Sequence, residues 1–236
     1  MTRLNIVSVS SGASSAVCAK RVIDRYGREN VHLVFADTLI EDTDNYRFLV
    51  DIKKFFGGAI LRLSEGRSPY DLFEDENIIP NNMFAPCTIK LKTELIELYA
   101  KSLIPDFDVT MHIGFDYKDK RPRPNKPNGR LDTPIERWNK IGVEVEYPLL
   151  WQPVEYNPLK TLFEMGIEPP DMYSKGYSHA NCGGMCVKQG IGDWRRTLIH
   201  YPERFAQVEA WEKKCVKNKS RRGGRHIQFC AVTGNA

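Results

Sequence analysis

Short apolar runs alternate with amphipathic stretches through the first 150 residues of the chain. Five of these runs have the pattern of buried parallel strands: residues 6–9, 31–36, 59–63, 107–113 and 143–149. Three stretches between them carry apolar side chains at helical spacing: residues 16–26, 42–56 and 87–103. Because strands that alternate with helices form parallel sheets covered on both faces, the pattern predicts an α/β fold around a five-stranded, mostly parallel sheet.

The pattern changes after residue 150, where no further strand of the main sheet is evident. Three later stretches show helical spacing instead: residues 157–165, 192–200 and 202–214. We therefore expect an α/β domain over residues 1–150 and a helical C-terminal portion over residues 151–236 that packs on the same domain. Residues 118–130 are crowded with proline and basic side chains, so this segment is expected to form a loop.

Composition narrows the class of protein. The 236 residues are 42% hydrophobic and 27% charged, as in a soluble globular protein of one domain or one domain with an appendage. The net charge of +4 permits contact with nucleic acid without requiring it. No apolar run approaches the length of a membrane span and no signal peptide precedes the first strand, so we expect a cytoplasmic protein without a membrane partner. Six cysteines in that location favour metal binding or catalysis over disulfides.

The first apolar run ends in a stretch of very small residues, here called the serine loop: Ser10, Ser11, Gly12, Ala13, Ser14 and Ser15. Small side chains let a backbone wrap closely around an anion, and Gly12 is free to adopt a strained φ. We expect Ser14 or Ser15 to cap a helix that begins near Ala16. Unpaired N–H groups at that helix start predict a phosphate site, with a serine-rich turn that binds nothing as the alternative.

Polar residues follow the second predicted strand at the same edge of the sheet. Asp37 and Thr38 come directly after it, and Glu41, Asp42 and Thr43 lie just beyond. Acidic and hydroxyl groups at a strand end are suited to a ribose or to Mg²⁺. Asp42 or Thr43 is also expected to cap the helix over residues 42–56.

Cysteines mark two further segments. Cys87 lies at the start of the helical stretch over residues 87–103, where the pKa of a thiol is lowered, and Lys90 and Lys92 follow it as partners for phosphates. Cys182 and Cys186 are separated by Gly-Gly-Met, and the glycines allow both thiols to turn toward one metal ion. A reduced pair without a metal is the alternative, and Cys18, one turn into the first helix, is expected in the core.

Together these segments resemble the PP-loop ATP pyrophosphatase superfamily, which contains phosphoadenosine-phosphosulfate (PAPS) reductases, adenine nucleotide α-hydrolases and thiolation enzymes. The serine loop is similar to the Ser-Gly-Gly-x-Asp/Ser-Ser loop of that group, with Ser11 in place of a glycine. The Asp37-Thr38 region and the Cys87 segment resemble its Asp-Thr-x-x-Glu region and its cysteine–lysine element. Order and spacing agree from Ser10 to Cys186, so the resemblance covers most of the chain.

The resemblance implies a set of site residues. Nucleotide binding is expected at Ser10, Ser11, Gly12, Ala13, Ser14, Ser15, Asp37, Thr38, Gly114 and Arg121. Catalytic roles are expected for Cys87, Lys90, Cys182 and Cys186. Metal binding is expected at Cys87, Cys182, Cys186 and Cys230, with His179 or Cys215 as alternative fourth ligands or with that position open. A [4Fe-4S] cluster is expected, and structural Zn²⁺ is the alternative.

The resemblance also implies an activity. We expect the chain to bind ATP or a related adenine nucleotide with Mg²⁺, to cleave the α–β phosphate bond, and to adenylate an acceptor for sulfur transfer. The acceptor is expected to be tRNA or DNA, which the basic residues 217–225 would contact. Further partner hypotheses are a cysteine desulfurase or another sulfur donor and a homodimer.

Two other functions stay open. One is a PAPS or adenylyl-sulfate reductase that forms sulfite. Asp116 stands where a basic residue of the family's Gly-x-Arg signature is expected, and residues 229–231 lack the reductases' Glu-Cys-Gly tail, so both features disfavour it. The other is a non-catalytic nucleotide-binding module that uses zinc only for structure.

Overall fold

The computed structural model describes residues 1–82, 84–120, 127, 129–151 and 157–221. Its centre is a five-stranded sheet in the order β3-β2-β1-β4-β5, in which every neighbouring pair is parallel. The strands are β1 (Thr2–Ser8), β2 (Val31–Ala36), β3 (Ile60–Leu63), β4 (Phe107–His112) and β5 (Glu144–Glu146). The predicted α/β fold with a five-stranded parallel sheet is confirmed.

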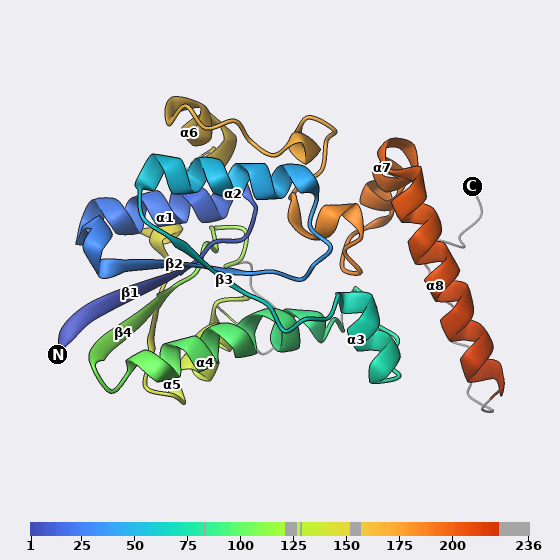
Figure 1. Ribbon diagram of the computed structural model, residues 1–236, viewed down its shortest axis with the longest axis horizontal. Coiled ribbons are helices and arrows are strands. Elements are labelled where there is room, and N and C mark those ends of the chain that lie inside the picture. The colour runs from blue at the N-terminus through green and yellow to red at the C-terminus, as the bar shows by residue number, and fades with distance from the viewer. Residues whose placement is uncertain (83, 121–126, 128, 152–156, 222–236) are drawn as a thin grey trace.

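Helices cover both faces of this sheet (Figure 1). The α-helices are α1 (Ala13–Tyr26), α2 (Thr43–Phe56), α3 (Pro69–Asp75), α4 (Glu94–Leu103), α5 (Asp132–Asn139), α6 (Pro158–Glu164), α7 (Ile191–His200) and α8 (Pro202–Arg221). Short helical turns are η1 (Arg28–Asn30), η2 (Ile89–Thr93), η3 (Pro148–Leu150), η4 (Asp171–Tyr173) and η5 (Asn181–Gly184). Helices α1 and α2 lie on one face and α4 and α5 on the other, while α7 and α8 lie beyond the carboxyl ends of the strands (Figure 1).

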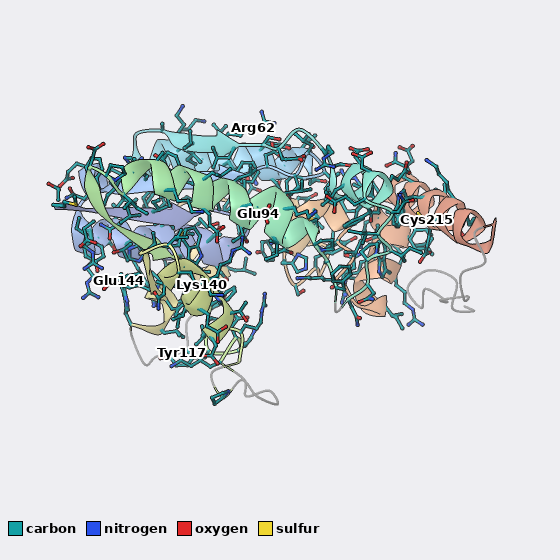
Figure 2. The ribbon with its side chains drawn as sticks, turned by 90° about the horizontal axis from the view of Figure 1, so that it is seen from below. Arg62, Glu94, Tyr117, Lys140, Glu144 and Cys215 are labelled. Carbon is teal, nitrogen blue, oxygen red and sulfur yellow. The ribbon has the colours of Figure 1, made fainter. Side chains whose placement is uncertain are left out.

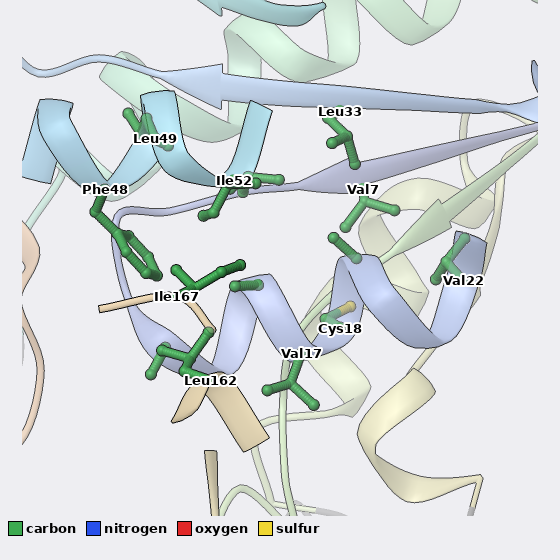
Figure 3. Close-up of a cluster of buried hydrophobic side chains, with 14 of the residues drawn as sticks. Val7, Val17, Cys18, Val22, Leu33, Phe48, Leu49, Ile52, Leu162 and Ile167 are labelled. Carbon is green, nitrogen blue, oxygen red and sulfur yellow. The ribbon is translucent and has the colours of Figure 1, made fainter. Parts of the chain in front are cut away.

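Each face of the sheet has its own apolar core, because successive strand residues point to opposite faces. On one face Val7 and Leu33 lie in a buried cluster with Val22 of α1 and Ile52 of α2, and Figure 3 shows Val17 on the side of α1 away from the strands. Leu162 of α6 joins the same cluster, so part of the helical C-terminal portion packs directly on the α/β domain. On the other face the strands pack against α4 and α5 through a second set: Ile6, Val34, Val109, Met111, Ile96, Ala100 and Trp138.

Cys18 is fully buried in the first of these cores, as expected (Figure 3). Burial raises the pKa of its thiol, so Cys18 is an inert apolar side chain.

The start of α1 differs from the prediction. The helix begins at Ala13 with Gly12 as its N-cap, and no side chain caps it. Ser15 is inside the first turn, where its hydroxyl donates to the Gly12 carbonyl at 2.7 Å. The expectation that Ser14 or Ser15 caps the helix was therefore wrong, whereas Asp42 caps α2 as expected by accepting the Asp44 N–H group at 2.9 Å.

The fifth strand is shorter than its apolar run. Strand β5 covers three residues, because Pro148 has no N–H group to donate and begins the turn η3. Figure 2 shows Lys140 and Glu144, near β5, toward one end of the molecule and Cys215 of α8 toward the other end.

Among the described residues, no helix has the length and apolar character needed to cross a membrane.

Candidate functional site

The candidate site lies where the strand order reverses. Strands β2 and β3 extend to one side of β1 while β4 and β5 extend to the other, so the carboxyl ends of β1 and β4 border a crevice suited to ligands. The serine loop follows β1 and Gly114 follows β4. A methyl group added to Gly114 would lie 3.4 Å from the Ser14 carbonyl and 3.5 Å from Ser15 Cα, so the segment after β4 packs closely against the first turn of α1. Arg121 lies outside the described residues.

Hydrogen bonds within the serine loop use two of its backbone N–H groups. Gly12 N–H donates to the Ser10 carbonyl at 2.6 Å, and Ser15 N–H donates to the Gly12 carbonyl at 3.1 Å. Among the described residues, the N–H groups of Ser11 and Ser14 have no protein acceptor. Ser14 is partly exposed, so its amide and the positive end of α1 are the part of the loop nearest to solvent, whereas Ser11 is fully buried and would have to be uncovered before its amide could receive an anion.

A third amide of the loop is used by a tyrosine from the C-terminal portion. The Ala13 N–H group donates to the Tyr173 hydroxyl oxygen at 2.9 Å. The same hydroxyl would be 3.4 Å from a methyl group on Gly12, and Asn181 Oδ1 would be 3.7 Å from it. The loop is thus partly covered by protein, and a phosphate that used all the predicted N–H groups would have to displace Tyr173.

Asp37 and Thr38 are buried beside β2 rather than open to a ligand. Asp37 Oδ2 accepts from Arg62 Nε at 2.7 Å and from the Tyr46 hydroxyl at 3.1 Å, while Oδ1 accepts the Leu39 N–H group at 2.8 Å. Both carboxylate oxygens are therefore engaged, and this arrangement does not fit a direct Mg²⁺ ligand. Asp37 instead holds the turn that carries residues 38–42.

Cys182 and Cys186 lie together at η5. Cys182 has a left-handed backbone with φ of 61°, which is uncommon for a residue other than glycine and is typical of functional sites. The Cys182 thiol donates a hydrogen bond to Cys186, and this bond lowers the pKa of Cys186 against the opposing effect of burial. The pKa of Cys182 is raised by the same bond and by burial. Of the two thiols, Cys186 is therefore the one favoured as a thiolate, and a catalytic role for either cysteine stays a prediction.

Cys87 lies close to this pair, and we call the three residues the thiol cluster: Cys87, Cys182 and Cys186. Burial and then the charge of Cys186 raise the pKa of Cys87, so the lowered pKa expected for a thiol at this helix start was wrong. Tyr70 of α3 contacts the same region, since burial and then the charges of all three cysteines raise the pKa of its phenol. The Tyr70 hydroxyl donates to the Met185 carbonyl at 2.8 Å and so holds the chain between the paired cysteines.

Lys92, rather than Lys90, faces the thiol cluster. Burial disfavours the charged form of Lys92, but the charges of Cys182, Glu41, Cys186 and Cys87 outweigh it and raise the pKa of the ammonium group. Lys92 lies in η2, a π-helical turn inserted in the helix that runs from Cys87 to Leu103, and such turns are frequent at functional sites. Lys90 pairs with both oxygens of Glu76 at 2.6 Å on the neighbouring surface.

Glu41 joins the serine loop to the thiol cluster. Its side chain is only 1% exposed. Among the described residues, its carboxylate has four hydrogen-bond donors and one cation as partners. The donors are the Cys182 N–H group at 2.7 Å, Asn45 Nδ2 at 3.0 Å, the Ser11 hydroxyl at 3.2 Å and the Thr38 hydroxyl at 3.4 Å. The cation is the Lys92 ammonium group, with Nζ at 3.7 Å. Glu41 therefore stands at the centre of the site.

Within the described parts of the chain, no three His, Cys, Asp or Glu side chains are grouped so that they could hold a metal ion. Two of the predicted ligands, Cys182 and Cys186, lie close enough for each to change the pKa of the other. Cys230 lies outside the described residues. His179 has a buried Nδ1 atom without a partner among the described residues, and its charge helps to lower the pKa of Cys186. The arrangement is thus one of interacting thiols, and an iron–sulfur or zinc centre stays a prediction.

Sequence reasoning considered Glu41 only as one of several groups suited to a ribose or Mg²⁺, and it assigned no role at this site to Tyr173 or Tyr70. Glu41 carried a signal, because it completes an Asp-Thr-x-x-Glu pattern, but its contacts depend on Cys182, 141 residues away in the chain. Tyr173 and Tyr70 have no local pattern that separates them from core tyrosines.

Comparisons with known proteins give distant similarities. No protein-family model matches the chain. In sequence it is similar to the uncharacterized protein MJ0066 of Methanocaldococcus jannaschii, with 23% identity over 232 residues that cover 89% of this chain and 44% of that protein. The chain thus spans less than half the length of this relative. In structure it is similar to a PAPS reductase from Candida auris in a phosphate complex, with a TM-score of 0.48 and 14% identity over 74% of this chain and 78% of that one.

Proposed function

We propose that the chain is a PP-loop enzyme that binds ATP at the serine loop, adenylates an acceptor and transfers sulfur to it from the thiol cluster. The single observation that carries this proposal is Glu41, which accepts hydrogen bonds from Ser11 of the loop and from the Cys182 backbone. An anion site and a pair of reactive thiols thus share one buried carboxylate. An enzyme that joins nucleotide chemistry to sulfur chemistry requires this proximity.

The first step is adenylation. An oxygen atom of the acceptor attacks the α-phosphorus of ATP, the α–β phosphate bond breaks, and pyrophosphate leaves. Such a step depends on positioning and on neutralising negative charge. The amides of Ser11 and Ser14 and the start of α1 would orient the phosphates, and Lys92 would supply the positive charge. Mg²⁺ would enter with ATP, since Asp37 is already engaged by Arg62 and Tyr46.

The second step is sulfur transfer. A sulfur atom delivered to Cys186 as a persulfide attacks the adenylated carbon, and AMP leaves. The Cys182 thiolate, formed as its proton is lost, then attacks the Cys186 sulfur, so that a Cys182–Cys186 disulfide forms and the acceptor keeps the transferred sulfur. A thiol reductant restores both cysteines. The hydrogen bond between the two thiols supports this assignment of roles. A nucleic-acid acceptor, tRNA or DNA, is part of the proposal.

The test uses the full chain with ATP, Mg²⁺, dithiothreitol, a cysteine desulfurase and ³⁵S-cysteine under anaerobic conditions. Incorporation of ³⁵S into tRNA or DNA that requires ATP would support the proposal. A Cys186→Ser variant should lose incorporation while it still releases pyrophosphate, whereas Cys18→Ala, which changes a cysteine of the apolar core, serves as the control and should retain both.

Three results would favour the other functions or contradict the proposal. Sulfite release from PAPS or adenylyl sulfate with thioredoxin would indicate the reductase. Tight ATP binding without turnover in protein that contains zinc would indicate a nucleotide-binding module. Absence of ³⁵S transfer to every tRNA and DNA pool in the presence of a working desulfurase would contradict sulfur transfer to nucleic acid.

A further inference from the structure

Three segments that are far apart in sequence meet at one carboxylate group. The Ser11 hydroxyl of the serine loop, Lys92 of η2 and the Cys182 N–H group of η5 all lie within hydrogen-bond or ion-pair distance of Glu41. Glu41 Oε2 alone accepts from both Ser11 and Cys182, at 3.2 and 2.7 Å. Because the Glu41 side chain is 1% exposed, water has little opportunity to replace either donor.

The backbone at Cys182 depends on this carboxylate. Both Cys182 and Gly183 are left-handed, with φ of 61° and 55°. A methyl group on Gly183 would lie 2.6 Å from the Ile40 carbonyl oxygen, so the turn packs directly against the segment that carries Glu41. A left-handed cysteine persists only where its surroundings hold it, and the 2.7 Å bond from its N–H group to Glu41 is one of the contacts that do so.

The Ser11 hydroxyl has one hydrogen to give, and Glu41 receives it in this structure. A phosphate at the serine loop brings strong acceptor oxygens beside the same hydroxyl. When Ser11 turns its hydrogen to the phosphate, Glu41 Oε2 loses a donor and its bonds to Cys182 and Asn45 readjust. Lys92, which faces both Glu41 and the thiol cluster, is drawn toward the added negative charge at the same time.

We infer that Glu41 is a positioning residue that couples occupancy of the serine loop to the placement of Cys182 beside Cys186. Sulfur chemistry at the pair is then restrained until a nucleotide is bound. The inference rests on the proposed function in one respect, namely that the occupant is ATP. The hold of Glu41 on Cys182 is independent of the identity of the ligand.

The test measures rates of alkylation by iodoacetamide at each cysteine, using peptide mass spectrometry of the full chain with and without saturating ATP. In the wild type, ATP should change the rate at Cys182 or Cys186 by at least threefold. In Glu41→Gln, the side-chain NH2 group replaces one carboxylate oxygen and faces groups that are themselves donors. The turn at Cys182 should therefore be held less firmly. The rate at Cys182 without ATP should rise at least threefold, and the ATP response should disappear. Ser11→Ala should also lose the ATP response.

Glu97→Gln is the matched control, because Glu97 is another buried glutamate. It lies on α4 and pairs with Arg137 of α5. It should behave as the wild type. If Glu41→Gln does not fold, as judged by thermal melting, Ser11→Ala decides the question. An unchanged ATP response in folded Ser11→Ala or Glu41→Gln that binds ATP would overturn the inference.

Failure of the proposed function is seen separately. If calorimetry detects no ATP binding to the wild type, the proposed function fails. The inference about Glu41 is then decided by the alkylation rates measured without ATP. A Cys182 rate in Glu41→Gln equal to that of the wild type would then overturn it, and a threefold rise would support the hold of Glu41 on the turn.

Discussion

The Ala13 N–H group donates a 2.9 Å hydrogen bond to the Tyr173 hydroxyl, which links the first turn of α1 to the C-terminal portion. This bond occupies an amide that the serine loop would otherwise offer to a phosphate. If ATP binds as proposed, with all the predicted amides, it must displace the tyrosine, and its affinity would then include the cost of that displacement.

Replacing Tyr173 by Phe should strengthen ATP binding. The variant frees the Ala13 amide, so the dissociation constant should fall by about two- to fivefold, as expected for a net hydrogen bond of roughly 0.5–1 kcal/mol. Calorimetry measures this change. Tyr177→Phe is the control, because the Tyr177 hydroxyl pairs with the Thr197 hydroxyl at 3.0 Å and not with an amide of the serine loop, and it should leave the affinity unchanged. Weaker binding by Tyr173→Phe would mean that the hydroxyl contacts the nucleotide.

Replacing Lys92 by Met should nearly abolish formation of AMP. Methionine keeps an apolar stem but removes the charge that faces both Glu41 and the thiol cluster, so the rate should fall about 100-fold or more. Lys90→Met is the matched control, because the Lys90 ammonium group already pairs with Glu76. Its rate should stay within about threefold of the wild type. Equal losses in the two variants would refute the assignment of Lys92.

Alkylation of Cys186 should depend on pH in a characteristic way. The hydrogen bond from Cys182, helped by the Lys188 amide and by His179 and opposed by burial, lowers the pKa of Cys186 to about 6. The thiolate is present above that pH and is lost as the pH falls through it. In reduced, chelator-treated protein the iodoacetamide rate at Cys186 should be half-maximal near pH 6.

Cys182→Ala supplies the comparison for this profile. Removing the donor should move the half-maximal pH of Cys186 upward by about one unit or more. A profile that is the same with and without Cys182 would show that the hydrogen bond between the two thiols does not set the reactivity of Cys186.

Stability should fall as the solution is acidified below pH 6.5, partly because of His112. Burial, together with Arg3 and Arg25, lowers the pKa of this imidazole to about 3, so His112 is neutral in the folded protein. An unfolded histidine binds a proton below about pH 6.5, so acid favours unfolding. The contribution of His112 lowers the unfolding free energy from near pH 6.5 downward, and this decrease grows as the pH falls toward 3. It should reach about 2 kcal/mol at pH 5.

Urea unfolding of His112→Gln at pH 7 and pH 5 measures this contribution. The variant removes the titrating group, so its unfolding free energy should fall less between the two pH values than that of the wild type, by about 2 kcal/mol. His200→Gln changes an exposed histidine of α7 and should follow the wild type. An unchanged pH dependence in His112→Gln would contradict the buried, neutral state of His112.

The sheet was predictable because its signal is local. Apolar runs of strand length and the helical spacing between them are set by burial on both faces, and they gave all five strands and α1, α2 and α4. Helices α3 and α5 were not predicted, because α3 is only seven residues long and α5 is mostly polar. Strand β5 was predicted too long because its apolar run continues into η3.

The site was harder to predict because its contacts join distant segments. Residue types identified the serine loop and the cysteines as candidates, but they could not show that Tyr173 covers the loop or that Glu41 holds the Cys182 turn. Lys90 was predicted instead of Lys92 as the catalytic lysine, because a local feature of the helix was not visible in the residue pattern. The π-helical turn η2 changes which side chains share a face of the helix, and normal helical spacing does not indicate such a turn.

The most direct test of the account follows the phosphates of ATP. The full chain would be incubated anaerobically with ATP labelled at the α-phosphate, together with Mg²⁺ and tRNA or DNA, and the nucleotide products would be separated. Labelled AMP in an amount equal to the pyrophosphate released, strongly reduced in Lys92→Met, is the predicted result. Labelled ADP, or ATP left intact with every acceptor, would contradict cleavage between the α- and β-phosphates.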